Sequence, residues 1–108
     1  MPISDWYAVE FDAEEIRLSA SPPGHQSWVQ SFRWDEIERV CFEAAGFAVS
    51  DGLYIFTSLR PESYALPVES AGGQELWFEI IRRGLFDAEL AIQAAASVET
   101  VFCWPPAN

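Results

Sequence analysis

The spacing of apolar residues along the chain changes once, near Gly72. Before this point, apolar and polar residues alternate in short runs, a period of two that is typical of strands with one buried face. After it, apolar residues recur at intervals of three and four; they are Leu76, Trp77, Ile80 and Ile81. This spacing predicts an amphipathic helix from Gln74 to Arg83, which Gly84 is well placed to end.

The alternating part predicts six short strands: Trp6–Phe11, Ile16–Ala20, Trp28–Trp34, Arg39–Ala44, Leu53–Thr57 and Tyr64–Val68. The turn signals between them are residues 12–15, the Pro/Gly loop 21–27, the polar segment 35–38, Asp51-Gly52 and residues 60–62. The segment 35–38 reads as a tight turn or one helical turn, and residues 46–49 as a continuation of the strand before them. Pro67 places the last strand at an edge or at a bulge, because proline cannot donate to the ladder.

Two further elements follow the first helix. Asp87 can cap a second helix that runs to about Ala96, with an apolar stripe of Ala88, Ala91, Ile92 and Ala95. The apolar tail from Val98 to Trp104 can add a seventh strand. We therefore expect residues 1–108 to form one α+β domain. Its antiparallel sheet, or partly open barrel, would have six to seven strands, followed by one or two C-terminal helices.

A short segment of the chain resembles a known family. In Phe32–Val40 a strand ends in a turn that begins Trp-Asp-Glu-Ile, and Asp51–Phe56 and the later helix follow in the same order. This order resembles bacterial pleckstrin-homology-like domains over about residues 6 to 83. The resemblance implies their architecture. Lipid-binding members carry a basic pocket between the first strands, whereas this chain has Asp12, Glu14 and Glu15 there, so the resemblance implies a protein partner.

The charge of the chain disfavours several classes of partner. Seventeen acidic residues face six basic residues, all of them Arg, which gives a formal net charge of −11. Such a surface repels nucleic acids and anionic membranes, whereas a basic protein or a cation is compatible with it. The absence of Lys also removes Schiff-base chemistry and P-loop phosphate binding.

The two cysteines bear on the cellular compartment. The first residues, Met1 to Asp5, do not form a secretory leader, and no apolar run has the length of a membrane span. We therefore expect a cytoplasmic protein in which Cys41 and Cys103 are reduced and buried as small apolar side chains. A disulfide would require the fold to bring them together, and the sequence leaves this open.

Candidate catalytic and metal-binding groups are sparse, and we expect no cofactor. His25, the single histidine, lies in the Pro/Gly loop, and nothing near it in sequence orients Cys41 or Cys103 toward it as a nucleophile. Carboxylates cluster at Glu14/Glu15, at Asp35/Glu36/Glu38 and at Glu75/Glu79, without calcium-loop spacing. The Ser70–Gly73 turn could cradle an anion, although a helix-capping turn uses the same residues.

The aromatic residues suggest where a partner would bind. We predict that Trp34 is a partly exposed anchor with an acidic rim of Asp35, Glu36 and Glu38, which would suit a basic protein. In the alternative, Trp34 plugs the end of the barrel. The preferred function is a non-catalytic, bacterial-type binding module, such as an immunity or inhibitor protein. The alternatives are a binder of small hydrophobic ligands with an aromatic-lined interior, and a hydrolase that uses carboxylates and His25.

Overall fold

The computed structural model describes residues 2–44, 51–98 and 100–106. Within them the helices and strands follow in this order: η1 (Ile3–Asp5), β1 (Tyr7–Phe11), β2 (Glu15–Ala20), β3 (Trp28–Arg33), η2 (Trp34–Glu36), β4 (Ile37–Ala44), β5 (Gly52–Thr57), β6 (Arg60–Pro67), α1 (Gly73–Arg82), α2 (Ala88–Ala95) and β7 (Thr100–Trp104). The α+β class is confirmed. The predicted strand continuation over residues 46–49 lies outside the described residues.

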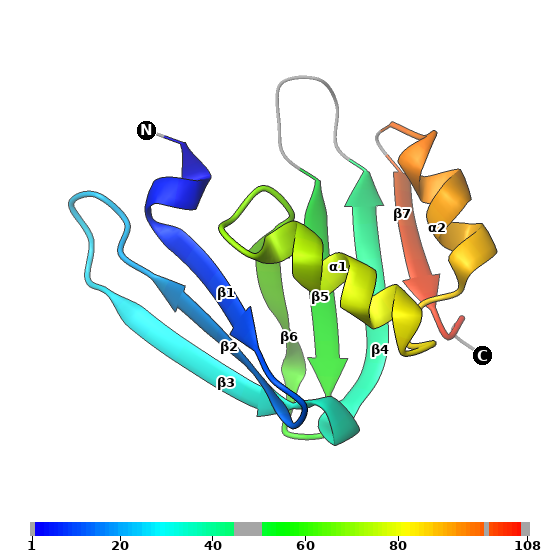
Figure 1. The fold of residues 1–108 in the computed structure, drawn as a ribbon, viewed down its shortest axis with the longest axis horizontal. Coiled ribbons are helices and arrows are strands. Elements are labelled where there is room, and N and C mark those ends of the chain that lie inside the picture. Colours follow the sequence, from blue (N-terminus) through cyan, green and yellow to red (C-terminus); the bar gives the residue numbers. More distant parts are fainter. Residues whose placement is uncertain (1, 45–50, 99, 107–108) are drawn as a thin grey trace.

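The strands form two antiparallel sheets (Figure 1). One has three strands in the order β1-β2-β3, and the other has four in the order β6-β5-β4-β7. The prediction of one sheet that closes toward a barrel is therefore wrong. The 3-10 turn η2 redirects the chain after β3, so that β4 pairs with β5 and β7 and leaves β3 at the edge of the first sheet.

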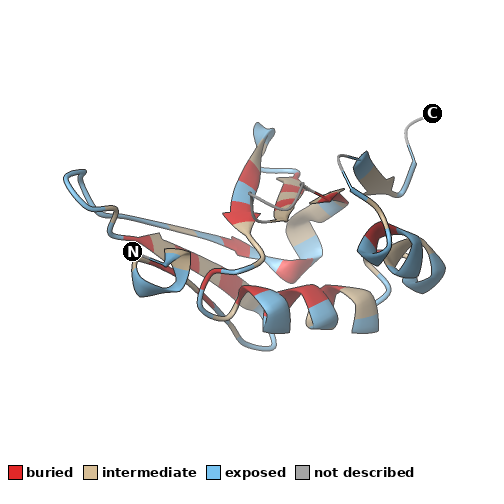
Figure 2. Ribbon diagram, turned by 90° about the horizontal axis from the view of Figure 1, so that it is seen from above, coloured by how far each residue is buried: buried red, intermediate tan, exposed pale blue. Residues whose placement is uncertain are grey.

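Helix α1 lies beside the three-stranded sheet and faces the four-stranded one. An isolated parallel bridge joins Ala71, just before the helix, to Ala8 of β1, and Trp77 of α1 stacks on Phe42 of β4 at 4.9 Å between ring centroids. Figure 2 shows the buried residues gathered where these two layers meet. Trp77 and Ile80 are buried, as the period of the helix predicted.

Gly72 positions α1 against β1. Its φ is +81°, a left-handed conformation that favours glycine, and a Cβ at this position would lie 2.2 Å from the backbone oxygen of Val9. Gly84 ends the helix as expected, with φ +76°. The Ser70–Gly73 segment is therefore a tightly packed structural turn, and the Ser70 hydroxyl donates to the Pro67 carbonyl at 2.7 Å.

Two local predictions are wrong. The turn between β5 and β6 lies at Ser58 and Leu59, because Thr57 pairs directly with Arg60, and β6 already begins at Arg60. Pro61, which suggested a turn, is tolerated because β6 is an edge strand. The expectation that Pro67 belongs to an edge strand is confirmed.

The predicted apolar stripe of α2 is also wrong. Ile92 is 71% exposed, whereas Ala94 is buried and Leu90 and Ala91 are partly buried. Apolar residues occupy several sides of this short helix, so its period could not select the face that packs. The predicted cap is confirmed, because the Asp87 side chain accepts a hydrogen bond from the Leu90 amide at 3.0 Å.

Candidate interaction site

The residues predicted to bind a partner lie where the chain passes from one sheet to the other. Trp34, Asp35 and Glu36 form η2. Glu38 is the second residue of β4, where the register shifts between Ile37 and Arg39. In Figure 1, η2 adjoins the turn between β1 and β2. The site therefore combines segments that are about twenty residues apart in the sequence.

Trp34 is buried, with 7% of its surface exposed. Its indole nitrogen donates to the Asp12 carbonyl at 2.8 Å, and its backbone N–H donates to the Glu14 carbonyl at 3.1 Å. The Arg83 guanidinium covers the ring at 3.9 Å from its centroid, a cation–π geometry. The ring is not the partly exposed anchor that we predicted. Its position agrees with the alternative, in which Trp34 is a plug, although it closes the end of a sheet rather than of a barrel.

By holding the β1–β2 turn against η2, Trp34 gathers carboxylates from both segments. We call this group the acidic corner; its members are Asp12, Glu14, Asp35, Glu36 and Glu38. The side chains of Asp35 and Glu14 are 71% and 75% exposed, and Asp12 and Glu38 are exposed as well. Sequence reasoning named the three residues around η2 but missed the first two as members of the same surface, because only the fold joins them.

Two of these carboxylates also organise the backbone. Asp12 accepts hydrogen bonds from the amides of Glu15 and Glu14 at 2.9 and 2.8 Å, and these bonds hold the pKa of its carboxyl below the usual value. Glu36 accepts from the Arg33 amide at 2.8 Å and caps η2. Among the described residues, neither the Asp35 nor the Glu38 carboxylate accepts a backbone hydrogen bond, so neither is tied to the backbone in this way.

Arg33 partly balances the acidic corner. Its guanidinium lies 3.3 Å from the Asp35 carboxylate and 3.9 Å from that of Glu14. Two further cations lie nearby. Arg83 is paired with Glu79 on α1 at 2.8 Å, and Arg17, whose charge acts on Asp12, is paired with Glu10 and Glu15. Carboxylates therefore outnumber cations at the corner. Beside it, Trp34, Asp35, Arg83 and Leu85 line an open depression of about 380 Å³. The lining combines the Asp35 carboxylate with the Arg83 guanidinium, so the attraction for a basic protein comes from the exposed carboxylates of the corner.

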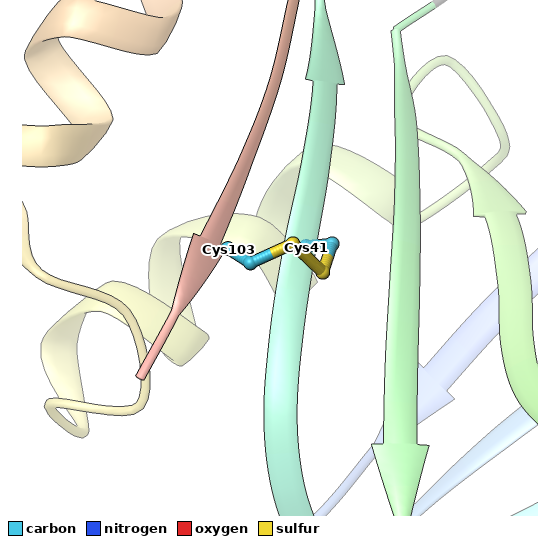
Figure 3. The surroundings of a disulfide bond; sticks show 2 residues. All are labelled: Cys41 and Cys103. Atoms are coloured by element: carbon cyan, nitrogen blue, oxygen red, sulfur yellow. A yellow bond between two sulfur atoms is a disulfide. The ribbon is translucent and has the colours of Figure 1, made fainter. Parts of the chain in front are cut away.

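Cys41 and Cys103 form a disulfide (Figure 3). The two residues face each other directly across the β4–β7 pair, with their Cα atoms 4.0 Å apart. The expectation of reduced thiols is therefore wrong, because the register of two strands distant in sequence brings the cysteines together. The bond also leaves no free thiol to act with His25 as a nucleophile.

The structure adds little support to the other candidate sites that the sequence suggested. His25 is exposed in its loop, and among the described residues no group of three or more His, Cys, Asp or Glu side chains is arranged to hold a metal ion. Glu79 pairs with Arg82 and Arg83, which makes it part of a helix-surface ion network. No helix in the described part of the chain has the length and apolar character needed to cross a lipid bilayer.

The aromatic interior is filled by its own rings. Phe32 of β3 stacks on Tyr64 of β6 at 4.4 Å, which joins the two sheets, and Trp77 contacts both Phe42 and Phe86 at 4.9 and 4.8 Å. These contacts fill the parts of the interior where the rings meet, and a separate open depression of about 330 Å³ is lined by residues that include Ile3, Tyr54 and Leu66. Burial raises the pKa of Tyr7 to about 12, and its hydroxyl donates to the Ala65 carbonyl at 2.8 Å.

Comparison of the chain with protein-family models, with curated proteins and with solved structures finds no significant match.

Proposed function

We propose that this chain is a non-catalytic interaction module that binds a basic protein through the acidic corner. The observation that carries the proposal is the gathering of exposed carboxylates around a rigid support. Trp34 fixes η2 to the β1–β2 turn. Asp35 and Glu14 project from these segments into solvent, and the exposed Glu38 lies two residues after η2, at the start of β4. Charges held in place before binding raise the rate of association with an oppositely charged partner and select among partners.

An immunity or inhibitor protein that masks a basic effector is the specific form of this proposal. The net charge of −11 supports it, because the whole surface attracts a basic protein at long range. The proposed relation to pleckstrin-homology-like domains is supported by the order of the elements, in which six antiparallel strands of the described chain precede α1, although β7 follows α2. The alternative, a binder of small hydrophobic ligands, has less support because the interior rings pack on one another.

We also propose that the chain folds in an oxidising compartment. The Cys41–Cys103 bond supports this location over the cytoplasm that we expected from the sequence, because cytosolic thiols are kept reduced. Trapping free thiols with an alkylating reagent as the cells are lysed tests the point. Protein that carries two alkyl groups would favour the cytoplasm.

The test of the binding function compares charge reversals at two places. A partner recovered with the chain as bait is purified, and its affinity is measured by calorimetry at low and high salt. We expect Asp35→Lys with Glu38→Lys to weaken binding by more than about tenfold, and added salt to weaken the binding of the unchanged chain. Glu36 is left in place because it caps η2.

The matched control is Glu89→Lys, an exposed position on α2, which Figure 1 shows well away from η2. This substitution changes the net charge in the same direction as the double variant and by half as much, without touching the acidic corner, so each single reversal, Asp35→Lys or Glu38→Lys, is the like-for-like comparison. We expect Glu89→Lys to change the affinity less than about twofold. Binding that ignores salt, or that responds equally to both kinds of variant, would contradict the proposal.

A further inference from the structure

Strand β3 forms an open edge of the three-stranded sheet. Within the described part of the chain it pairs with β2 alone. Of the other three edge strands among the described residues, β1 and β6 are covered or interrupted, whereas β7 pairs on one side only, with β4. The free side of β1 exchanges hydrogen bonds with Ala71, at 2.6 Å from the Val9 amide and 2.9 Å to the Tyr7 carbonyl, and β6 carries Pro61 and Pro67. The edge of β3 has neither kind of protection.

The hydrogen bonds next to this edge show which backbone groups point outward. Trp34 donates to the Glu14 carbonyl, in the same register that pairs Arg33 with Glu15, so the backbone of Trp34 points toward β2. Alternate residues of an antiparallel strand point to opposite sides. The backbone groups of Trp28, Gln30 and Phe32 therefore also face β2, and those of Val29, Ser31 and Arg33 face away from it.

The pairing of β1 with β2 supports the same assignment. Ser21 donates to the Trp6 carbonyl at 2.8 Å, in the register of that pair, so the odd-numbered residues of β2 point toward β1 and the even-numbered ones toward β3. Of the outward amides on β3, that of Arg33 already donates to Glu36 at 2.8 Å. The amides of Val29 and Ser31 are left, two residues apart, at the spacing that an added strand needs.

The side chains at this edge do not hinder an added strand. Val29 is 67% exposed, Ser31 is exposed, and neither carries a charge. Trp28, 37% exposed, packs its ring edge-on against Tyr7 at 5.5 Å and so supports the start of the strand from the inner face. No proline or lysine interrupts residues 28–33, although these are the residues that commonly protect an edge.

The charge at one end of β3 indicates the occupant. The strand runs directly into η2, so a segment lying along its edge ends beside Asp35 and the rest of the acidic corner. A second copy of the chain would bring another net charge of −11 to the contact, whereas a basic segment would be attracted. Strand addition draws affinity from main-chain hydrogen bonds and specificity from the flanking side chains.

We infer that an extended, basic segment of the protein partner adds a strand to the outer edge of β3. Its main chain bonds the backbone groups of Val29 and Ser31, and lysine or arginine residues at one of its ends meet the acidic corner. The inference rests on the proposed function, which supplies the basic charge of the partner. It adds how that partner binds.

The experiment uses synthetic peptides and amide NMR spectra of the full chain. Two probes are peptides of alternating threonine and valine that carry two lysines, at the N-terminus in one and at the C-terminus in the other. Matched probes carry glutamates in place of the lysines. We expect one lysine probe to shift the amide signals of Val29 and Ser31 and to slow their hydrogen exchange by about tenfold or more. The matching glutamate probe should bind at least about tenfold more weakly.

The variants separate the backbone from the side chain. Ser31→Pro removes an outward N–H without removing a bond to β2, and Ser31→Ala keeps that N–H. We expect Ser31→Pro to weaken probe binding by about tenfold or more relative to Ser31→Ala. If Ser31→Pro fails to fold, as judged by circular dichroism, Val29→Pro with Val29→Ala gives the same comparison, and the exchange measurement needs no variant.

Each contrary result has a distinct meaning. Slow hydrogen exchange of the Val29 and Ser31 amides in the free monomer would mean that these amides are already bonded, and it would overturn the claim that the edge of β3 is open. A lysine probe that shifts only the amides of η2 and is indifferent to Ser31→Pro overturns strand addition and leaves the proposed function standing. Equal binding of the glutamate probe overturns both. A dimer that Ser31→Pro dissociates in sedimentation overturns the assignment to a basic partner, because the occupant is then a second copy.

Discussion

Removing the Cys41–Cys103 bond should destabilise the fold through the unfolded chain. The bond closes a loop with a sequence separation of 62 residues. In the loop-entropy model, a cross-link of this span lowers the entropy of the unfolded chain enough to add about 4 kcal/mol to the free energy of unfolding. Small domains have only about 5–15 kcal/mol in total, so the loss would be a large part of the stability.

Urea unfolding with and without a dithiol reductant measures this loss. For an m-value within the usual range of about 1–3 kcal/mol/M, we expect reduction to lower the midpoint by at least about 1 M. The double variant Cys41→Ala with Cys103→Ala is the control. It should unfold near the midpoint of the reduced chain, and the reductant should not change it.

Two results would refute this reasoning. One is a loss below about 1 kcal/mol in protein whose thiols are shown to be bonded, because the loop entropy would then have little effect on stability. The other is the detection of two free thiols in unreduced, denatured protein. That outcome would mean that β4 and β7 do not hold the cysteines in the register described here.

Three further predictions concern single residues. Trp34→Phe removes the indole N–H that donates to the Asp12 carbonyl, and we expect urea unfolding to show a loss of about 1–3 kcal/mol; an unchanged midpoint would argue against the plug. Gly72→Ala places a Cβ 2.2 Å from a backbone oxygen of β1, so it should cost at least about 2 kcal/mol, and more than Gly84→Ala, where φ is +76° but the space is open. Hydrogen bonds from two arginines lower the pKa of Glu79 from 4.5 to about 2, so its stabilising effect should be present above pH 4.5 and be lost as the pH falls toward 2. In Glu79→Gln, acid unfolding curves should show a weaker dependence of stability on pH over that interval; an identical dependence would refute the ion network.

Features that depend on neighbouring residues were predicted well from the sequence. The alternation around Tyr7 and Ile16 predicted a hairpin, and the three-and-four spacing after Gly72 predicted α1 and its buried face. The cap at Asp87 and the end of α1 at Gly84 were also correct. Periodicity, capping and turn chemistry act over a few residues, so these elements carry their own signals.

Other local features gave no decisive signal. The turn at Ser58 and Leu59 contains neither glycine nor asparagine, and the nearby Pro61 suggested a turn in the wrong place. The face of α2 was ambiguous because its apolar residues, including the exposed Ile92, surround the helix. In both cases the packing of neighbouring strands selected one of several arrangements that the residues allow.

The sequence by itself determined that strands precede a helix, that the surface is acidic, and that carboxylates surround Trp34. Only the tertiary structure decided that the strands divide into two sheets at η2, and that Trp34 is buried beneath Arg83. It also decided that Asp12 and Glu14 join Asp35 in one surface, and that Cys41 meets Cys103. These outcomes depend on contacts between segments that are distant along the chain. The packing of the whole core sets the register of those contacts, so local sequence patterns do not predict it.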